Sequence, residues 1–261
     1  MTNLSLESGL NIFLKDNGEL DFGEKLLKVS PQLRFFSEVR DFFRDKKANF
    51  SKGEILYYMY RGVAKKSDLD FFKKRNWRYD LTVILPGLIG DEFNKTIGHF
   101  HNFAEGKNLS YPEVYEVIFG KALFLIQKIN YQTKEVEKFW LIEATQGDKV
   151  VIPRQENFLF GHTTVNIGND FLVLANLQNL FTISDYSFYR QNQGAVYYVL
   201  YNPNKNKNNK EYLITPNPCY SKHPVPEISK GERSFGFFHK FDSPLYQEVI
   251  SHPNKFSFLD L

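Results

Sequence analysis

The chain has 261 residues, of which 42% are hydrophobic and 16% aromatic, enough for one large domain with a sizeable core. Its formal net charge of +3 comes from 33 basic and 30 acidic residues, too small a surplus for the concentrated basic surface that nucleic-acid binding needs. The only cysteine, Cys219, excludes an intramolecular disulfide and gives no sign of an oxidising compartment.

We expect no targeting or membrane-spanning segment in this sequence. Its first eight residues lack the basic region, apolar core and small-residue cleavage site of a secretory signal peptide. The longest apolar run, residues 81–89, is interrupted by Pro86 and Gly87 and is too short to cross a bilayer. We therefore expect a cytoplasmic protein that binds neither membranes nor nucleic acid.

The N-terminal part shows little β patterning. Residues 31–47 space apolar side chains at helical intervals after a Ser30-Pro31 start, which predicts one amphipathic helix. We assign residues 1–50 to an N-terminal extension that carries this helix and packs on the rest of the fold. The tyrosine-rich residues 55–60 favour a strand, and residues 65–74 a short charged helix.

From Tyr79 onward, short apolar segments alternate with turn residues, the pattern of a β-sandwich or barrel. The main domain should span residues 51–220, and the scattered prolines beyond it favour a C-terminal strap, residues 221–261, lying over the barrel. Residues 202–210 predict a solvated hairpin loop. We expect strands near residues 80–85, 97–102, 113–119, 121–129, 138–144, 149–153, 162–167, 170–177, 195–201 and 211–214.

Four residues have the spacing of a metal site. His99 and His101 lie two positions apart in a predicted strand, so both imidazoles face the same side of the sheet. Glu113 reaches the same face if residues 102–112 form a loop between antiparallel strands, and His162 supplies a third imidazole. Three neutral imidazoles and one carboxylate suit divalent iron, manganese, nickel or zinc and leave coordination positions open.

These candidates lie within two longer motifs. The motifs are Glu113-x6-Gly120, and Gly147-x5-Pro153 followed by Gly161-His162-x3-Asn166. Together they resemble the two halves of the cupin signature, which implies a mainly β fold: a double-stranded β-helix, or jelly-roll barrel, here with a helical N-terminal attachment. The resemblance implies one divalent transition metal per subunit.

The sequence departs from the usual cupin pattern at two spacers. The gaps from His101 to Glu113 and from Pro153 to Gly161 are longer than usual, and we interpret both as loop insertions. Glu116 is the rival carboxylate ligand. We prefer Glu113 because Gly120 then falls at the expected distance.

A closer resemblance is carried by longer segments. They are residues 79–86, 90–101, 109–117, 120–128, 175–177, 184–186, 194–198 and 216–218. Over about residues 55–220 the chain resembles the cupin-type glucose-6-phosphate isomerase of archaea and some bacteria. The resemblance implies a metal-containing homodimer that interconverts glucose 6-phosphate and fructose 6-phosphate in glycolysis and gluconeogenesis, with iron among the expected metals.

The resemblance also suggests residues that touch the substrate. Thr82, Thr96, Gly98 and Tyr186 match the family's phosphate contacts, and their hydroxyls and backbone N–H groups are suitable donors to a dianion. Tyr115 matches a family active-site position, and we expect its phenol to point away from Glu113.

The reaction has two conceivable routes. In a cis-enediol route Glu113 would be the base, whereas in a hydride shift it would be a ligand only. Two functions from other classes also stay open: a metal-dependent cupin dioxygenase that consumes oxygen, and a sugar-binding cupin without turnover. The binding module is disfavoured because all four candidate ligands are present.

Overall fold

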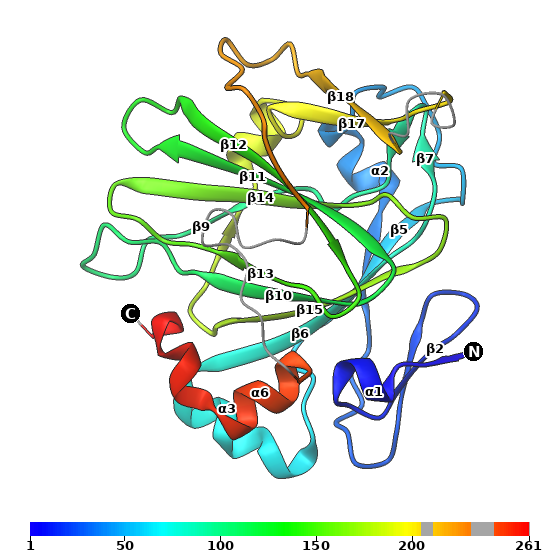
Figure 1. Cartoon of the computed structure of the whole chain (residues 1–261), viewed down its shortest axis with the longest axis vertical. Helices are drawn as coiled ribbons and strands as arrows, with labels where there is room; N and C mark the ends of the chain where they lie inside the picture. The colour runs from blue at the N-terminus through cyan, green and yellow to red at the C-terminus, as the bar shows by residue number, and fades with distance from the viewer. Residues whose placement is uncertain (205–210, 231–242, 261) are drawn as a thin grey trace.

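The computed structural model describes residues 1–204, 211–230 and 243–260. Two large sheets, antiparallel except for the pair of β12 and β19, lie one above the other and form a barrel (Figure 1). The six-stranded sheet has the order β13-β10-β15-β6-β5-β4, and the four-stranded sheet the order β14-β11-β12-β19. The mainly β double-sheet fold expected from the sequence is confirmed.

The strands of the two large sheets have the following bounds. The six-stranded sheet contains β4 Gln32–Phe35, β5 Ile55–Tyr60, β6 Trp77–Ile84, β10 Glu113–Phe119, β13 Lys149–Ile152 and β15 Leu172–Asn179. The four-stranded sheet contains β11 Lys121–Asn130, β12 Val136–Thr145, β14 Phe158–Asn166 and β19 Glu227–Lys230.

Three further sheets of short strands, β1-β2-β3, β16-β9 and β18-β17-β8-β7, and several short helices complete the described fold. The small strands are β1 Thr2–Asn3, β2 Ile12–Leu14, β3 Leu20–Phe22, β7 Leu88–Ile89, β8 Glu92–Phe93, β9 Phe100–His101, β16 Ser184–Asp185, β17 Tyr197–Tyr201 and β18 Tyr212–Pro216. The helices are α1 Ser5–Ser8, α2 Phe36–Val39, η1 Arg40–Phe42, η2 Lys66–Asp68, α3 Leu69–Arg75, α4 Ser187–Gln191, α6 Leu245–Ser251 and η4 Pro253–Leu259. Among the described residues, no helix is both long and apolar enough to cross a membrane.

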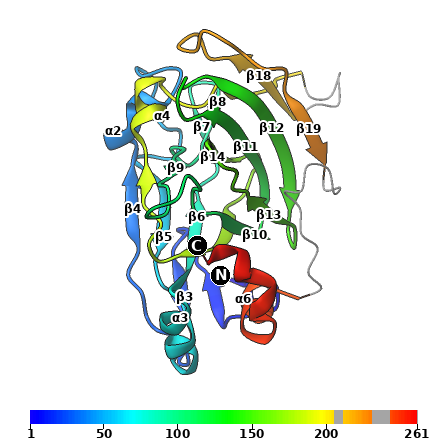
Figure 2. The same cartoon turned by 90° about the vertical axis from the view of Figure 1, so that its left-hand side faces the viewer.

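The six-stranded sheet is covered on both faces. Its outer face carries Val114 and Ile118 of β10, which pack in one apolar cluster with the N-terminal strands and with Tyr246 of α6. Figures 1 and 2 show α3, α6 and the N-terminal strands gathered on this side. Because both faces of the sheet are covered, β15 has no exposed residue. Strands buried in this way typically carry long apolar runs.

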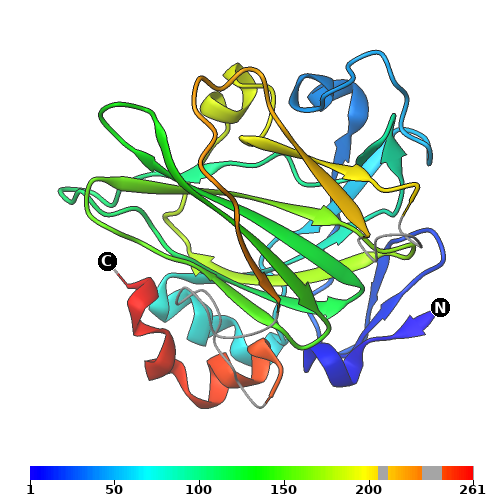
Figure 3. The same cartoon turned by 45° about the horizontal axis from the view of Figure 1, so that its top comes forward.

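The space between the two sheets holds the second apolar cluster. Val117 of β10 and Leu174 of β15 meet Phe124, Ile126 and other side chains of the four-stranded sheet there. The segment that leads into β19 runs alongside the four-stranded sheet, in orange in Figure 3, and β19 pairs in parallel with β12.

The long helix expected over residues 31–47 is wrong. Residues 32–35 form β4, which pairs with β5 at the sheet edge, and only the short turns α2 and η1 follow. The apolar positions were nevertheless core positions, since Phe36, Val39 and Phe42 are buried. An edge strand gains ladder hydrogen bonds that an isolated helix of this length does not, so tertiary pairing overrides the helical spacing.

Candidate metal centre

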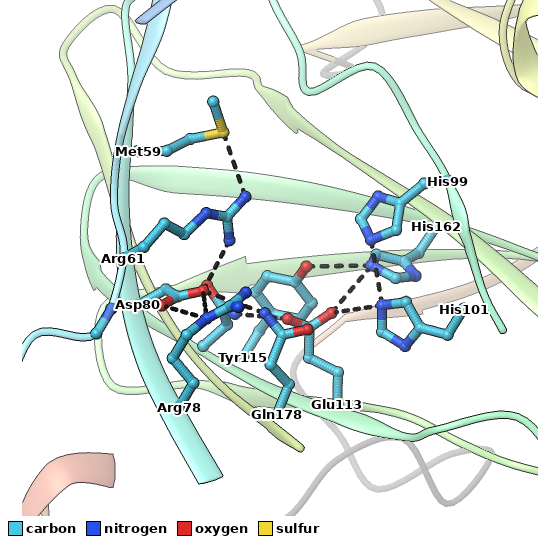
Figure 4. Close-up of polar contacts among 12 residues, drawn as sticks. Met59, Arg61, Arg78, Asp80, His99, His101, Glu113, Tyr115, His162 and Gln178 are labelled. Carbon is cyan, nitrogen blue, oxygen red and sulfur yellow. Dashed lines mark hydrogen bonds and ion pairs between the residues drawn. The ribbon is translucent and has the colours of Figure 1, made fainter. Parts of the chain in front are cut away.

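Four side chains converge between the two sheets. Glu113 opens β10 in the six-stranded sheet, His162 lies in β14 of the opposite sheet, and His101 lies in β9 between them. The backbone of His99 exchanges two hydrogen bonds with that of His162, of 3.2 and 3.1 Å, which fixes the two imidazoles side by side. One potential ligand atom from each of the four residues lies within 4.8 Å of the others. Figure 4 shows the cluster.

Two glycines let the histidine strands approach this closely. Gly98 has φ +41°, and a Cβ on it would lie 2.3 Å from the Tyr189 ring. A Cβ on Gly161 would lie 2.5 Å from the Phe100 ring. Both positions therefore require glycine, the first also for its left-handed backbone, and each directly precedes a candidate ligand.

Hydrogen bonds orient the ligand atoms. Nδ1 of His101 lies 2.8 Å from the carbonyl oxygen of Tyr111, which can only accept, so the proton sits on Nδ1. The lone pair of the neutral ring is then on Nε2, which faces the cluster. Orientation of a histidine ligand through its other nitrogen is the usual arrangement at metal sites.

The Glu113 carboxylate is held at one oxygen. Its Oε1 accepts a 2.6 Å hydrogen bond from Nδ2 of Asn176, while the buried Oε2 makes no well-formed hydrogen bond within the described chain. Oε2 instead lies 3.4 Å from Nε2 of His101 and 3.2 Å from Nε2 of His162. A buried carboxylate oxygen without a donor needs a cation to offset its desolvation, so this geometry suits a metal ion.

The electrostatics favour the protonation states that bind metals. Burial holds the pKa of His99 well below its usual range and also lowers the pKa of His162. Burial would raise the pKa of Glu113, but the adjoining His101 and His162 more than offset this and hold it well below its ordinary value. Neutral imidazoles at His99 and His162 and an ionised carboxylate at Glu113 are ligand states for a divalent transition metal, so the residues fit one.

The rival ligand Glu116 lies on the other face of β10. It accepts hydrogen bonds from Nζ of Lys149 at 2.9 Å and from the backbone N–H of Leu245 at 2.8 Å. The two-residue period of the strand separates it from Glu113, which leaves Glu113 as the carboxylate at the cluster.

Most of the other predicted site residues surround the cluster. Thr82, Thr96, Tyr115 and Tyr186 line one pocket together with His99 and Glu113. Gly98 adjoins this pocket as the residue before His99. The expectation for Tyr115 was wrong: two positions from Glu113 in an extended strand, it faces the same side, and its hydroxyl lies 3.1 Å from Nε2 of His162.

Sequence reasoning assigned no role to several pocket residues. Asn176, Gln178 and Arg61 line the same pocket, and Asn176 holds Glu113. The available signal was polar residues at alternate positions of an apolar strand, as in Ala175-Asn176-Leu177-Gln178. The alternation alone does not show which face of the strand is turned to the pocket, because that depends on the strand register.

The fold and the cluster together define a cupin with a candidate metal centre. The protein-family model described as glucose-6-phosphate isomerase (GPI) matches residues 35–215. The chain therefore belongs to the glucose-6-phosphate isomerase family and is an enzyme of the isomerase class.

Curated relatives agree with this assignment. The glucose-6-phosphate isomerase of Thermococcus kodakarensis is 31% identical over 173 residues, 64% of this chain and 76% of the relative. The enzyme of the same name from Pyrococcus furiosus is 30% identical over 165 residues, 60% of this chain and 75% of the relative. Among solved structures, oxalate decarboxylase from Bacillus subtilis is 19% identical with a TM-score of 0.32, covering 49% of this chain and 27% of that one. The fold assignment rests on the strand order described above.

Proposed function

We propose that this enzyme interconverts glucose 6-phosphate and fructose 6-phosphate in glycolysis and gluconeogenesis, and that it depends on one divalent transition metal per subunit. The observation that carries the proposal is the single pocket in which His99 and Glu113 of the metal cluster lie beside the candidate phosphate residues Thr82, Thr96 and Tyr186. Family membership supports the reaction. The donor set supports iron, manganese, nickel or zinc.

His99, His101, Glu113 and His162 would hold the ion. When bound, it would supply a positive charge that polarises the sugar carbonyl and offsets the oxyanion charge that develops during isomerisation. The protein's own contribution is positioning: Asn176 orients the Glu113 carboxylate, and the Tyr111 carbonyl orients His101.

Hydrogen transfer between C1 and C2 has two routes in this pocket. In the enediol route, the Glu113 carboxylate would take the proton from one carbon and return it to the other, so one base would perform both proton transfers. In the hydride route, Glu113 is a ligand only. Tyr115, whose hydroxyl lies beside His162, would donate to a substrate oxygen in either route.

The phosphate would lie between the six-stranded sheet and the segments that carry Thr96 and Tyr186. Thr82 faces the pocket from β6, and Tyr186 approaches from the segment after β16. Thr96 Oγ1 accepts a 2.9 Å hydrogen bond from the backbone N–H of Thr164 and lies 3.3 Å from Oγ1 of Thr163, so its proton would turn from Thr163 to the phosphate when substrate binds. Hydroxyl donors, with the backbone N–H of Gly98, suit a phosphate dianion.

Removing these donors should weaken substrate binding. Thr82→Val and Tyr186→Phe should each raise KM for fructose 6-phosphate, because a hydrogen bond to a charged group contributes roughly 1.5–3 kcal/mol. Steady-state kinetics of both variants would measure this. Thr215→Val in β18, outside the pocket, serves as the matched control. Unchanged KM in both pocket variants would mean that the phosphate binds elsewhere.

A coupled assay tests the function as a whole. Fructose 6-phosphate is supplied to the purified enzyme, and glucose 6-phosphate is detected through a dehydrogenase, with metal content measured on the same sample. Turnover supports the proposal. Oxygen uptake without isomerisation would instead indicate a dioxygenase, and sugar-phosphate binding without turnover would indicate a binding module.

The expected homodimer and cytoplasmic location complete the proposal. They are supported by the resemblance and by the sequence composition. Light scattering on the purified chain gives its mass in solution, and a mass equal to one chain would contradict the dimer.

A further inference from the structure

Arg61 faces the pocket from the end of β5 in the six-stranded sheet. Tyr57 and Met59 of β5 line the pocket, and Arg61 follows two positions later on the same face. Across the sheet, Asp80 of β6 lies opposite Asn176 of β15, and Asn176 lies opposite Tyr115. Arg61 therefore ends a row of polar side chains that leads to the candidate metal centre (Figure 4).

A buried carboxylate fixes the Arg61 side chain. Asp80 is fully buried and accepts a 2.7 Å hydrogen bond from Nη1 of Arg61. It also accepts hydrogen bonds from Nε of Arg78 at 3.0 Å, from the backbone N–H of Gly62 at 2.8 Å and from Nε2 of Gln178 at 3.1 Å. Two guanidinium groups thus share one carboxylate, which leaves an excess positive charge at the pocket wall.

The other side of the guanidinium is turned to the pocket. Among the described residues, Nη2 of Arg61 contacts the Met59 sulfur at 3.4 Å, and a thioether is only a weak acceptor. The Arg61 side chain is 32% exposed, whereas its partner Asp80 is fully buried. Burial alone would lower the pKa of Arg61, but the Asp80 carboxylate more than offsets this and raises it, so the group stays cationic.

No other lysine or arginine of the described chain lines this pocket. Arg61 also lies near the candidate phosphate residue Thr82. Thr82 of β6 pairs with Met59 of β5, and Arg61 follows Met59 by two positions. A guanidinium presents paired N–H donors in a planar fork that matches two phosphate oxygens, and it is the preferred partner of phosphate in proteins.

We propose that Arg61 is a specificity-determining residue that binds the phosphate of the substrate, with Asp80 holding its guanidinium in place. This inference rests on the proposed function and extends it. Thr82, Thr96 and Tyr186 offer neutral donors that a sugar hydroxyl could also satisfy, whereas Arg61 supplies the charge that selects a phosphorylated sugar over a free one.

Arg78 provides a matched control. Both arginines donate to Asp80 and have similar exposure, 32% and 27%, but only Arg61 lines the pocket. A purely structural role for Arg61 would therefore be shared by Arg78. Arg61→Gln and Arg78→Gln should lower the melting temperature to a similar extent, which separates support of Asp80 from contact with the substrate.

The test measures binding of a non-isomerisable hexitol 6-phosphate to the metal-loaded enzyme by calorimetry. Arg61→Gln should weaken this binding by about 10- to 100-fold, the loss expected for one charged hydrogen-bonding group, with metal content unchanged. Arg61→Lys should recover part of the affinity. Arg78→Gln should bind within about 3-fold of wild type, a change of under 1 kcal/mol.

Two results would overturn the inference: wild-type affinity in Arg61→Gln, or equal losses in Arg61→Gln and Arg78→Gln. The test stays separate from that of the proposed function. If the wild-type enzyme binds the hexitol phosphate through Arg61 but does not isomerise fructose 6-phosphate, the proposed function is contradicted and the phosphate-binding role of Arg61 is supported. If the wild-type enzyme isomerises fructose 6-phosphate and the Arg61→Gln variant binds the hexitol phosphate with wild-type affinity, only the role of Arg61 is contradicted.

Discussion

Glu113→Gln should lower kcat by about 10²–10⁴-fold, the usual contribution of a general acid–base group, while most of the metal stays bound. Glutamine keeps the size of the side chain and one oxygen able to bind the ion. It loses the negative charge and the basicity. Steady-state kinetics, with metal content measured on the same sample, would show the two effects separately.

Glu116→Gln is the control for this prediction. Glu116 is equally buried in the same strand but faces Lys149 on the other side, so its loss should lower thermal stability and leave kcat near wild type. Solvent exchange gives a second measurement. A base-held proton can exchange with water, so product formed in D₂O should carry deuterium at C1 or C2. Near-normal kcat in metal-loaded Glu113→Gln, together with no deuterium in the product, would exclude the base role and favour hydride transfer.

His101→Ala should abolish most metal binding and activity together. His101 is 3% exposed and has its Nε2 directed to the cluster by the hydrogen bond between Nδ1 and the Tyr111 carbonyl. Loss of an orienting partner alone typically weakens metal binding by about 10- to 100-fold, and loss of the ligand itself should exceed that. Metal titration of the purified variant would measure the change in affinity.

His252→Ala is the matched control for the histidine prediction. Its side chain is 56% exposed and pairs with Glu248 in α6, outside the candidate centre, so metal affinity should stay at the wild-type value. A double variant, His99→Ala with His162→Ala, gives the strictest form of the test. Full metal occupancy in that protein would mean that the ion binds elsewhere.

The sequence predicted most strands of the two large sheets because their apolar segments end at clear turn residues, whereas only Phe100–His101 of the strand expected over residues 97–102 is observed, as β9. The strand expected over residues 113–119 is observed as β10 with the same bounds, and that over residues 121–129 is one residue longer. The four candidate ligands could be identified because His-x-His needs only the two-residue period of a strand, and Glu113 and His162 lie within spaced motifs.

The sequence could not reveal features that depend on strand register. Arg61 and Asp80 are neighbours only because β5 pairs with β6, and Gln178 reaches Asp80 only because β15 pairs with β6. The helix wrongly expected over residues 31–47 has the same origin: its apolar spacing also suits an edge strand followed by short turns, and pairing with β5 decides between them.

The most direct test of the account is a metal titration of chelator-treated enzyme, with isomerase activity measured at each step. If His99, His101, Glu113 and His162 form one metal centre, activity should be lost with the ion. It should then return in proportion to bound metal and reach its full value at about one ion per chain. Full glucose 6-phosphate formation by metal-free enzyme would contradict the metal-dependent mechanism.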